Sequence, residues 1–376
     1  MYRPVPARID LPAMEQEILA KWARDNVFHR SLAATSEGDP WVFYEGPPTA
    51  NGMPGTHHIE ARVFKDVFPR FKTMQGRYVP RKAGWDCHGL PVELAVEREL
   101  GFSGKPDIEA YGIEAFKAKC SESVLRHVSE FGVMTERMGY WVDMDDAYWT
   151  MSSDYIESVW WSLAQIQKAG LLVEDHRVSP YCPRCGTTLS DHELAQGYET
   201  VTDPSVFVRM PVAADSPLAQ RFPGVTLLVW TTTPWTLVSN TAVAVSPTAE
   251  YSVIRTLDGE VLVVAEELRE RVAPESEVLA TLTGTELEHT GYVAPFDLVD
   301  VPEAHYVILG DYVTTEDGSG LVHIAPAFGA DDLFVARSYD LPMVNPVHPD
   351  GTFHEEIPLV GGMFFKDADP LLVEDL

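Results

Sequence analysis

The chain has 376 residues, of which 45% are hydrophobic, and its 57 acidic against 28 basic residues give a formal charge of −29. This length exceeds one ordinary core and fits two or three domains. No run approaches the roughly 18 apolar residues of a membrane span, the first residues lack the apolar core of a signal peptide, and four cysteines are too few for a disulfide scaffold. We therefore expect a cytoplasmic protein without membrane contact, and its acidity argues against general affinity for nucleic acid.

Helical and strand patterns alternate in the first half of the chain. Apolar residues spaced by three and four predict helices over residues 12–26, from about 59 onward, and over 113–138 and 154–168. In the last of these, Asp154 stands three positions before Glu157 and is the expected cap. The short apolar run 41–44 predicts a strand that leads into a loop rich in glycine and proline. The opening unit is therefore strand, glycine-rich loop and helix.

The pattern changes after about residue 200. Short β-rich runs, separated by glycine, proline and aspartate turns, predict strands over 225–230, 251–254 and 261–264. Helical patterns become scarce. The sequence thus predicts an α/β first part and a β-rich second part with a boundary near residue 200.

The segment Tyr44-Glu-Gly-Pro-Pro-Thr-Ala-Asn-Gly-Met-Pro-Gly-Thr-His-His58 lies where the strand passes into the helix. The first turn of a helix has unpaired N–H groups and the positive end of the dipole, which favours phosphate. His57 and His58 could donate further hydrogen bonds to a phosphate whose charge grows during reaction. An ordinary loop with two surface histidines explains the same residues equally well.

A second motif, Gly84-Trp-Asp-Cys-His-Gly-Leu-Pro-Val-Glu93, follows a basic stretch. The carboxylate of Asp86, next to a glycine and an aromatic ring, suits the binding of a substrate ammonium group. The alternative is a turn that carries a structural tryptophan.

Cys182-Pro-Arg-Cys185 has the spacing that places two thiolates on one metal ion. A structural zinc site needs four ligands, and the chain has no second pair of this kind; His192 has no partner at the usual spacing. The other interpretation is two reduced thiols in a turn. The pair is therefore a candidate half-site.

Two segments of the second part carry hydroxyl, imidazole and carboxylate groups. Thr231, Thr232 and Thr233 follow a hydrophobic run, and a glycine- and proline-containing segment holds His323 and Asp332. Hydroxyls can orient water and a carboxylate can hold an ammonium group, which is what hydrolysis of an aminoacyl ester requires. Each segment alone also has a structural explanation, because threonine is common in strands and aspartate near glycine is common in turns.

The two motifs of the first part, with residues 65–76 between them, resemble the start of a class I isoleucyl-tRNA synthetase. This resemblance rests on two sequence motifs, Pro-Pro-Thr-Ala-Asn-Gly and, after it, Gly-Trp-Asp-x-His-Gly-Leu-Pro-Val-Glu. It implies a Rossmann-like catalytic half-domain that binds ATP, with Mg²⁺, and isoleucine. Pro47 would line the side-chain pocket, Asp86 would hold the α-amino group, and His58 would contact the phosphates.

One signature departs from the family. Where the family has His-x-Gly-His, this chain reads Gly55-Thr-His57-His58, so the first and third positions are exchanged. Glycine at position 55 removes one side chain that could donate a hydrogen bond to phosphate, and the imidazole of His57 alters the space beside the nucleotide. We expect His57 to take over the donor role.

The resemblance extends to the end of the chain and implies its organisation. The expected ranges begin with a helical segment at 1–40 and the first half of the catalytic domain at 41–177. A zinc-ribbon half-site with Cys182 and Cys185 follows at 178–199, and an inserted editing domain at 200–370. Residues 371–376 would begin the return of the chain to the catalytic domain. The second catalytic half and the remaining zinc ligands would lie beyond this N-terminal fragment. The implied partners are tRNA(Ile), isoleucine and ATP, and the full-length protein, with its zinc ion, would be a monomer.

By the same resemblance, the three threonines and His323 would line a hydrolytic editing pocket, and Asp332 would bind the amino group of a wrongly attached amino acid. A second pocket has a physical purpose, because one pocket of isoleucyl-tRNA synthetases is measured to prefer isoleucine over valine by only about 150-fold. The expected activity is ligation of isoleucine to tRNA with hydrolysis of Val-tRNA(Ile). The alternative is a stand-alone aminoacyl-tRNA deacylase with a vestigial catalytic half.

Overall fold

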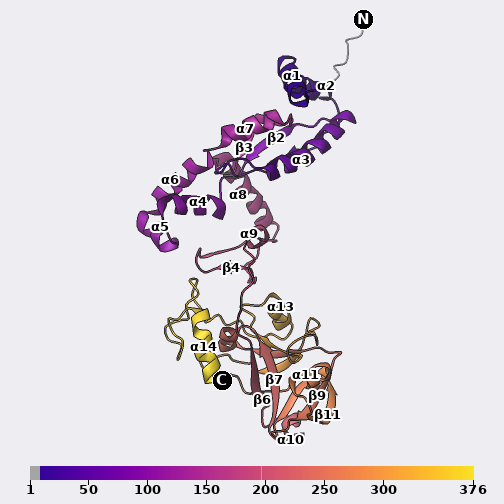
Figure 1. The fold of residues 1–376 in the computed structure, drawn as a ribbon, viewed down its shortest axis with the longest axis vertical. Coiled ribbons are helices and arrows are strands. Elements are labelled where there is room, and N and C mark those ends of the chain that lie inside the picture. The colour runs from indigo at the N-terminus through magenta and orange to yellow at the C-terminus, as the bar shows by residue number, and fades with distance from the viewer. Residues whose placement is uncertain (1–8, 196) are drawn as a thin grey trace. The chain divides into compact units, whose positions relative to one another are not determined.

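The computed structural model describes residues 9–195 and 197–376. The chain divides into two compact units, Met1–Glu174 and Asp175–Leu376, and each is described by itself (Figure 1). The α/β class predicted for the first part and the β-rich character predicted for the second are confirmed. Within the described residues, no helix is long and apolar enough to cross a bilayer.

The first unit is built on three parallel strands in the order β1-β2-β3, at Phe43–Tyr44, Arg81–Trp85 and Asp143–Trp149. Parallel strands need crossover connections, which here are helices. One helix joins β1 to β2, and four join β2 to β3. The helices of this unit are α1 (Leu11–Arg24), α2 (Val27–Ala34), α3 (Thr56–Met74), α4 (Leu90–Leu100), α5 (Lys105–Tyr111), α6 (Ile113–Val124), α7 (Val128–Arg137) and α8 (Ser153–Lys168).

Local chemistry explains where these helices begin. Pro12 lies in the first turn of α1, where a missing N–H is tolerated, and the Asp10 carboxylate accepts a hydrogen bond from the Ala13 backbone N–H at 3.1 Å. Two expectations were wrong in detail. The cap of α8 is Ser152, whose hydroxyl oxygen accepts from the Tyr155 N–H, so Asp154 only contributes charge to the first turn. The helix predicted over 113–138 is interrupted between α6 and α7.

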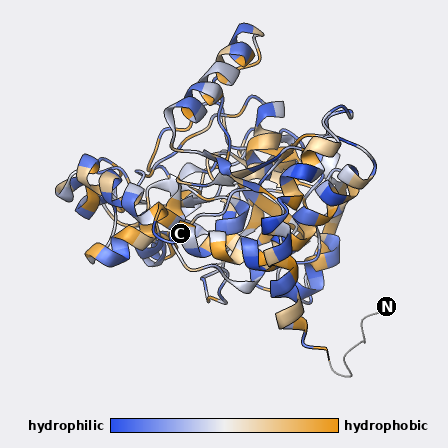
Figure 2. Ribbon diagram, turned by 90° about the horizontal axis from the view of Figure 1, so that it is seen from above, coloured by the Kyte–Doolittle hydropathy of each residue, from blue (hydrophilic) through white to orange (hydrophobic). Residues whose placement is uncertain are grey.

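The core of the first unit lies between β2 and its crossover helices. It includes Trp85 of β2, Val92 of α4, Val124 at the end of α6, and Phe131 of α7. The rings of Trp85 and Phe131 meet edge to face, with centroids 6.0 Å apart, a favoured aromatic geometry. Hydrophilic and hydrophobic residues are interspersed along the helices (Figure 2). The helices α1, α2, α5 and α8 contain no buried residue, so their apolar side chains stay at least partly accessible.

The second unit is organised around an eight-stranded mixed sheet in the order β11-β9-β10-β7-β13-β8-β12, with β6 paired to β7. Its elements are β4 (Tyr181–Cys182), β5 (Thr187–Thr188), α9 (Asp191–Ala195), β6 (Val206–Pro211), α10 (Pro217–Arg221), β7 (Val225–Thr231), η1 (Pro234–Ser239), β8 (Ala242–Val245), β9 (Glu250–Arg255), β10 (Val261–Ala265), η2 (Glu266–Leu268), α11 (Arg269–Val272), β11 (Glu277–Thr283), α12 (Gly284–Leu287), β12 (Tyr306–Leu309), β13 (Leu321–Ile324), α13 (Ala330–Ser338) and α14 (Phe365–Asp375).

Strand β7 is the centre of this sheet. It pairs antiparallel with β6 over residues 226–231, and parallel with β10 over residues 225–227. Farther along, Trp230 pairs with Val322 of β13. The carboxyl end of β7 therefore lies beside β13, although about ninety residues separate them in sequence. All residues of β8 and β10 are buried, so continuous apolar runs replace alternation in these strands.

The end of the chain packs onto the second unit. Ala368 and Leu372 of α14 are fully buried in its main core. The expected boundary between residues 370 and 371 falls inside this helix, and the expected boundary at 177 lies close to the division after Glu174.

Candidate active sites

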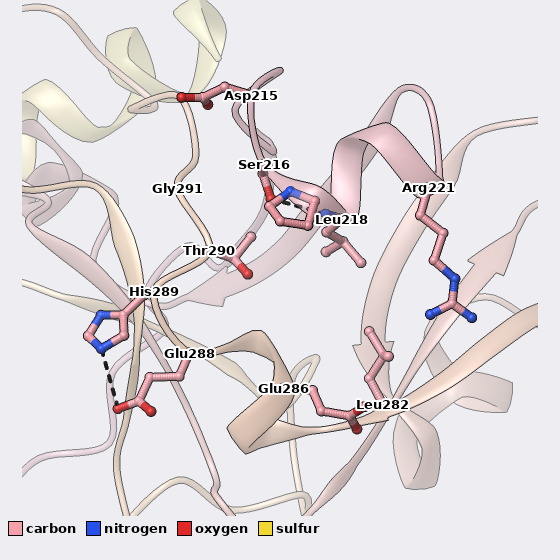
Figure 3. Close-up of a pocket in the computed structure, with 11 residues that line it drawn as sticks. Asp215, Ser216, Leu218, Arg221, Leu282, Glu286, Glu288, His289, Thr290 and Gly291 are labelled. Atoms are coloured by element: carbon pink, nitrogen blue, oxygen red, sulfur yellow. Dashed lines mark hydrogen bonds and ion pairs between the residues drawn. The ribbon is translucent and has the colours of Figure 1, made fainter.

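A cavity of the second unit with a volume of about 710 Å³ lies between α10, α12 and the segment 288–291 (Figure 3). Its polar groups serve local structure. The Ser216 hydroxyl oxygen accepts from the Leu218 N–H at the start of α10, and Glu286 caps α12 by accepting from the Thr283 N–H and hydroxyl. Glu288 accepts from the Tyr339 hydroxyl at 2.6 Å. None of the predicted site residues line this cavity.

A smaller cavity of about 340 Å³ contains all five residues predicted for ester hydrolysis. Tryptophan and phenylalanine rings and a fourth threonine also line this cavity. The complete lining is Trp230, Thr231, Thr232, Thr233, Trp235, Thr236, Val322, His323, Ala325, Phe328, Gly329 and Asp332. We call this cavity the threonine pocket. Its position follows from the sheet, because the end of β7 supplies the threonines, β13 supplies His323, and α13 begins just before Asp332.

Asp332 is a half-buried carboxylate without a cation. Its Oδ2 atom accepts a hydrogen bond from the Ala325 N–H at 2.9 Å, and no lysine, arginine or histidine pairs with it among the described residues. Burial raises its pKa from 3.8 to about 6, against the opposing effect of the Ala325 hydrogen bond, and Asp331 adds to the rise. A carboxylate held in this way gains most from a positively charged ligand that enters the pocket.

His323 is only 7% exposed and has a partner on each ring nitrogen. The Nε2 atom lies 3.0 Å from the Thr236 hydroxyl, and the Nδ1 atom lies 2.8 Å from the amide nitrogen of Asn240. Burial lowers the pKa of this imidazole to about 4. His323 is therefore neutral at physiological pH.

The threonine hydroxyls form a short chain. Thr236 donates to the Thr233 carbonyl at 2.8 Å, and the Oγ1 atoms of these residues are 3.1 Å apart. Thr233 in turn lies 3.3 Å, Oγ1 to Oγ1, from Thr231. Thr232 and Thr233 are exposed, so their side chains are open to a ligand. Sequence reasoning missed Asn240, and it did not assign Thr236 a role although Thr236 belongs to the same segment.

The first unit places its two histidines at the start of α3. Gly55 caps the helix, and its N–H donates to Nδ1 of His58 at 2.9 Å, which leaves the imidazole proton of a neutral His58 on Nε2. The rings of His57 and His58 have centroids 3.9 Å apart. A Cβ atom on Gly55 would lie 2.9 Å from the His57 ring. The ring of the exposed His57 thus occupies the space beside residue 55. Its replacement of the missing imidazole stays a prediction.

The loop before these histidines is fixed by a buried carboxylate. Glu45 is 3% exposed; it forms an ion pair with Lys65 of α3 at 2.6 Å and accepts a hydrogen bond from Tyr140. The Tyr148 hydroxyl donates to the Glu45 carbonyl at 2.5 Å. These contacts hold the end of β1 to the helix that carries the histidines.

Asp86 lines a separate cavity of about 350 Å³ at the end of β2. The other lining residues are His88, Thr150, Tyr155, Ile156, Val159 and Trp160. A carboxylate facing an apolar wall suits an amino acid with an ammonium group and a hydrocarbon side chain. Pro47 does not line this cavity; its neighbour Pro48 accepts a hydrogen bond from the Asp86 N–H at 3.0 Å. The sequence predicted a helix over residues 154–168 but gave no indication that its apolar face lines this cavity.

Comparison with known proteins decides the family. The model of class I tRNA synthetases (I, L, M and V) matches residues 17–307, which is more than half of the chain. The chain belongs to this family.

Curated relatives of this class I synthetase chain are isoleucine–tRNA ligases. It is 65% identical to that of Streptomyces coelicolor and 60% identical to that of Cutibacterium acnes, each match covering 100% of this chain and 36% of the relative. The ligase of Thermus thermophilus is 47% identical over 98% of this chain. The chain thus spans about a third of the length of these relatives. A solved structure titled "The crystal structure of GlLeuRS-CP1" matches 46% of this chain and 94% of its own at 17% identity, with a TM-score of 0.35, too low to support an argument.

The cysteine pair of this class I synthetase chain lies on a small hairpin. Cys182 ends β4, the Gly186 N–H donates to the Cys182 carbonyl at 2.8 Å, and β5 follows. Both thiols are free. Among the described residues, no three or more histidine, cysteine or acidic side chains are grouped as metal ligands. The pair fits half of a tetrahedral zinc site and does not complete one.

Proposed function

We propose that this chain is the N-terminal part of an isoleucine–tRNA ligase, and that its second unit hydrolyses valine wrongly attached to tRNA(Ile). The observation that carries the proposal is the threonine pocket, where a half-buried carboxylate without a cation, a neutral imidazole and a row of hydroxyls share one small cavity. The identity to isoleucine–tRNA ligases over the whole chain supports the choice of amino acid and tRNA.

In this proposal Asp332 binds the α-ammonium group of the aminoacyl ester. The ammonium group neutralises a half-buried carboxylate that otherwise has no counter-charge, so binding is favoured for an amino acid with a free amino group. Thr232 and Thr233, which are exposed, hold the ester and the attacking water. The indole and phenyl groups of Trp230, Trp235 and Phe328 exclude bulk water and strengthen these polar contacts.

The first unit has the corresponding role in synthesis. Asp86 binds the ammonium group of isoleucine against the apolar wall of α8, and His57 and His58 donate to phosphate at the start of α3. ATP with Mg²⁺ would supply the adenylyl group that becomes joined to the isoleucine carboxylate, with pyrophosphate as the leaving group. The full-length ligase would be located in the cytoplasm, where tRNA is charged, and would act as a monomer.

The test is deacylation of tRNA(Ile) charged with either valine or isoleucine by residues 1–376. We expect Val-tRNA(Ile) to be hydrolysed faster than Ile-tRNA(Ile). We expect Asp332→Asn to lower the rate of Val-tRNA(Ile) hydrolysis at least ten-fold. The matched control is Asp331→Asn, which changes the neighbouring exposed carboxylate by the same charge. Equal rates for Asp332→Asn and Asp331→Asn would refute the assignment of Asp332.

A second measurement concerns the first unit. We expect the chain to show no isoleucine-dependent exchange of pyrophosphate into ATP, because it spans about a third of its relatives. Exchange at the rate of a full-length ligase would show that residues 1–376 suffice for activation.

A further inference from the structure

Behind His323, on the side away from the threonines, lies a buried chain of hydrogen bonds. The Asn240 amide nitrogen is 2.8 Å from Nδ1 of His323 and 2.9 Å from the Ala242 carbonyl oxygen. The Asn240 amide oxygen lies 2.6 Å from the Tyr292 hydroxyl. Asn240 is 2% exposed and Tyr292 is 5% exposed, so water does not compete with these contacts.

This series of hydrogen bonds determines which nitrogen of the His323 imidazole carries the proton. A carbonyl oxygen only accepts hydrogen bonds, so the group that faces the Ala242 carbonyl is the Asn240 NH₂. The second hydrogen of that NH₂ points at Nδ1 of His323, which must therefore be the acceptor. The Tyr292 hydroxyl then donates to the remaining amide oxygen. The proton of the neutral ring is on Nε2.

This assignment sets the direction of the bonds that enter the pocket. Nε2–H of His323 donates to the Thr236 hydroxyl oxygen, and the Thr236 hydroxyl donates to the Thr233 carbonyl. A general base would instead need a free lone pair on Nε2. With its Nδ1 lone pair already occupied, His323 has none to offer toward the pocket.

We infer that Asn240 and Tyr292 are positioning residues which hold His323 as the Nε2–H tautomer, so that it serves the threonine pocket as a hydrogen-bond donor and not as a base. The inference rests on the proposed hydrolytic function of this pocket. It gives a role to Tyr292, on the segment before β12, that no motif in the sequence indicated.

Three titratable groups surround this arrangement besides His323. Tyr292 is joined to it through Asn240, and Asp332 lines the same pocket. His305 lies with Nε2 3.0 Å from the Asn240 carbonyl oxygen and packs edge to face on Tyr292 at 5.8 Å. Asn240 is thus contacted by protein groups both at its side chain and at its backbone carbonyl.

The direct test is ¹⁵N NMR of the histidine rings in the whole chain, with the His323 signals assigned by their loss in His323→Gln. We expect the ring proton on Nε2 in the unmodified chain. Asn240→Asp places an acceptor opposite Nδ1, and we expect the proton to be found on Nδ1. A proton on Nδ1 in the unmodified chain, or an unchanged tautomer in Asn240→Asp, would overturn the inference.

The kinetic test uses a pair of buried tyrosines. Tyr292→Phe removes the donor to Asn240 and is expected to lower kcat for Val-tRNA(Ile) deacylation five- to fifty-fold with little change in KM. Tyr251→Phe is the control, because it removes a buried hydroxyl that bonds to Ser246 and Gly320 instead. Equal loss in both variants would mean a structural role only. If the unmodified chain deacylates nothing while the proton is on Nε2, the proposed function fails and the tautomer assignment stands.

Discussion

Replacing Asp332 by asparagine should stabilise the second unit at neutral pH. The asparagine keeps the shape of the side chain and an oxygen that can accept from the Ala325 N–H. It removes a negative charge that is half-buried and lacks a cation. A pKa raised from 3.8 to about 6 corresponds to about 3 kcal/mol at roughly 1.4 kcal/mol per pH unit.

The pH dependence of this gain has a definite sign. Below pH 3.8 the carboxyl group is protonated in both the folded and the unfolded chain, so Asp332 costs nothing there. Between pH 3.8 and 6 only the unfolded chain is ionised, and folding stability falls as the pH rises. The advantage of Asp332→Asn is therefore complete above pH 6, about half as large at pH 5, and absent below pH 3.8.

The assay is unfolding in urea at pH 7.5 and pH 5.0. Unfolding is monitored through hydrogen exchange of the backbone amides of β7 and β8, so that only the second unit is measured. Asp331→Asn is the control, since it changes the net charge equally at an exposed position. An equal gain for both variants, or the same gain at both pH values, would refute the reasoning. The expected loss of deacylation in the stabilised variant would show the conflict between stability and activity typical of functional sites.

Three further predictions concern the first unit and the cysteine pair. Lys65→Met leaves the Glu45 carboxylate buried beside Tyr140 without its cation, and we expect it to destabilise the first unit by about 3 kcal/mol in urea unfolding. The double variant Glu45→Gln, Lys65→Met should recover much of that loss, and no recovery would speak against the ion pair as the cause. Gly55→Ala should change stability by less than about 1 kcal/mol, because the clashing atoms belong to the movable His57 ring; the NMR signals of that ring should shift, and unchanged signals would place His57 elsewhere. Removal of divalent metal with a chelator should leave the melting temperature of residues 1–376 unchanged, since Cys182 and Cys185 supply only two zinc ligands; a clear drop would mean that a metal site is completed.

The sequence predicted the groups that stand in short, chemically distinctive segments. Thr231 to Thr233 follow one β-rich run, and His323 and Asp332 lie within ten residues of each other, so local patterns sufficed to find them. That these segments share one pocket depends on the pairing of β13 with β7. Their assignment to editing, and the assignment of His57, His58 and Asp86, stay predictions.

The residues that were missed owe their place to long-range pairing. Asn240 and Tyr292 are about fifty residues apart in the sequence and are brought together by the fold, and neither belongs to a motif that the sequence offered. The wall of α8 was missed for another reason. Apolar spacing predicts a helix face that is covered, but not what covers it, and in this chain Ile156, Val159 and Trp160 are exposed around the Asp86 cavity.

Trp235, a wall of the threonine pocket, is held from the far end of the chain. Its backbone N–H donates to Asp369 Oδ1 at 2.9 Å, and its ring lies 4.5 Å from that of Phe365, both in α14. A ribosome completes β7 well over a hundred residues before it reaches Asp369, and native contacts between such distant segments form late. A nascent chain shorter than 369 residues therefore lacks the Asp369 contact to Trp235, and this wall of the threonine pocket takes its final shape only after α14 has been synthesised.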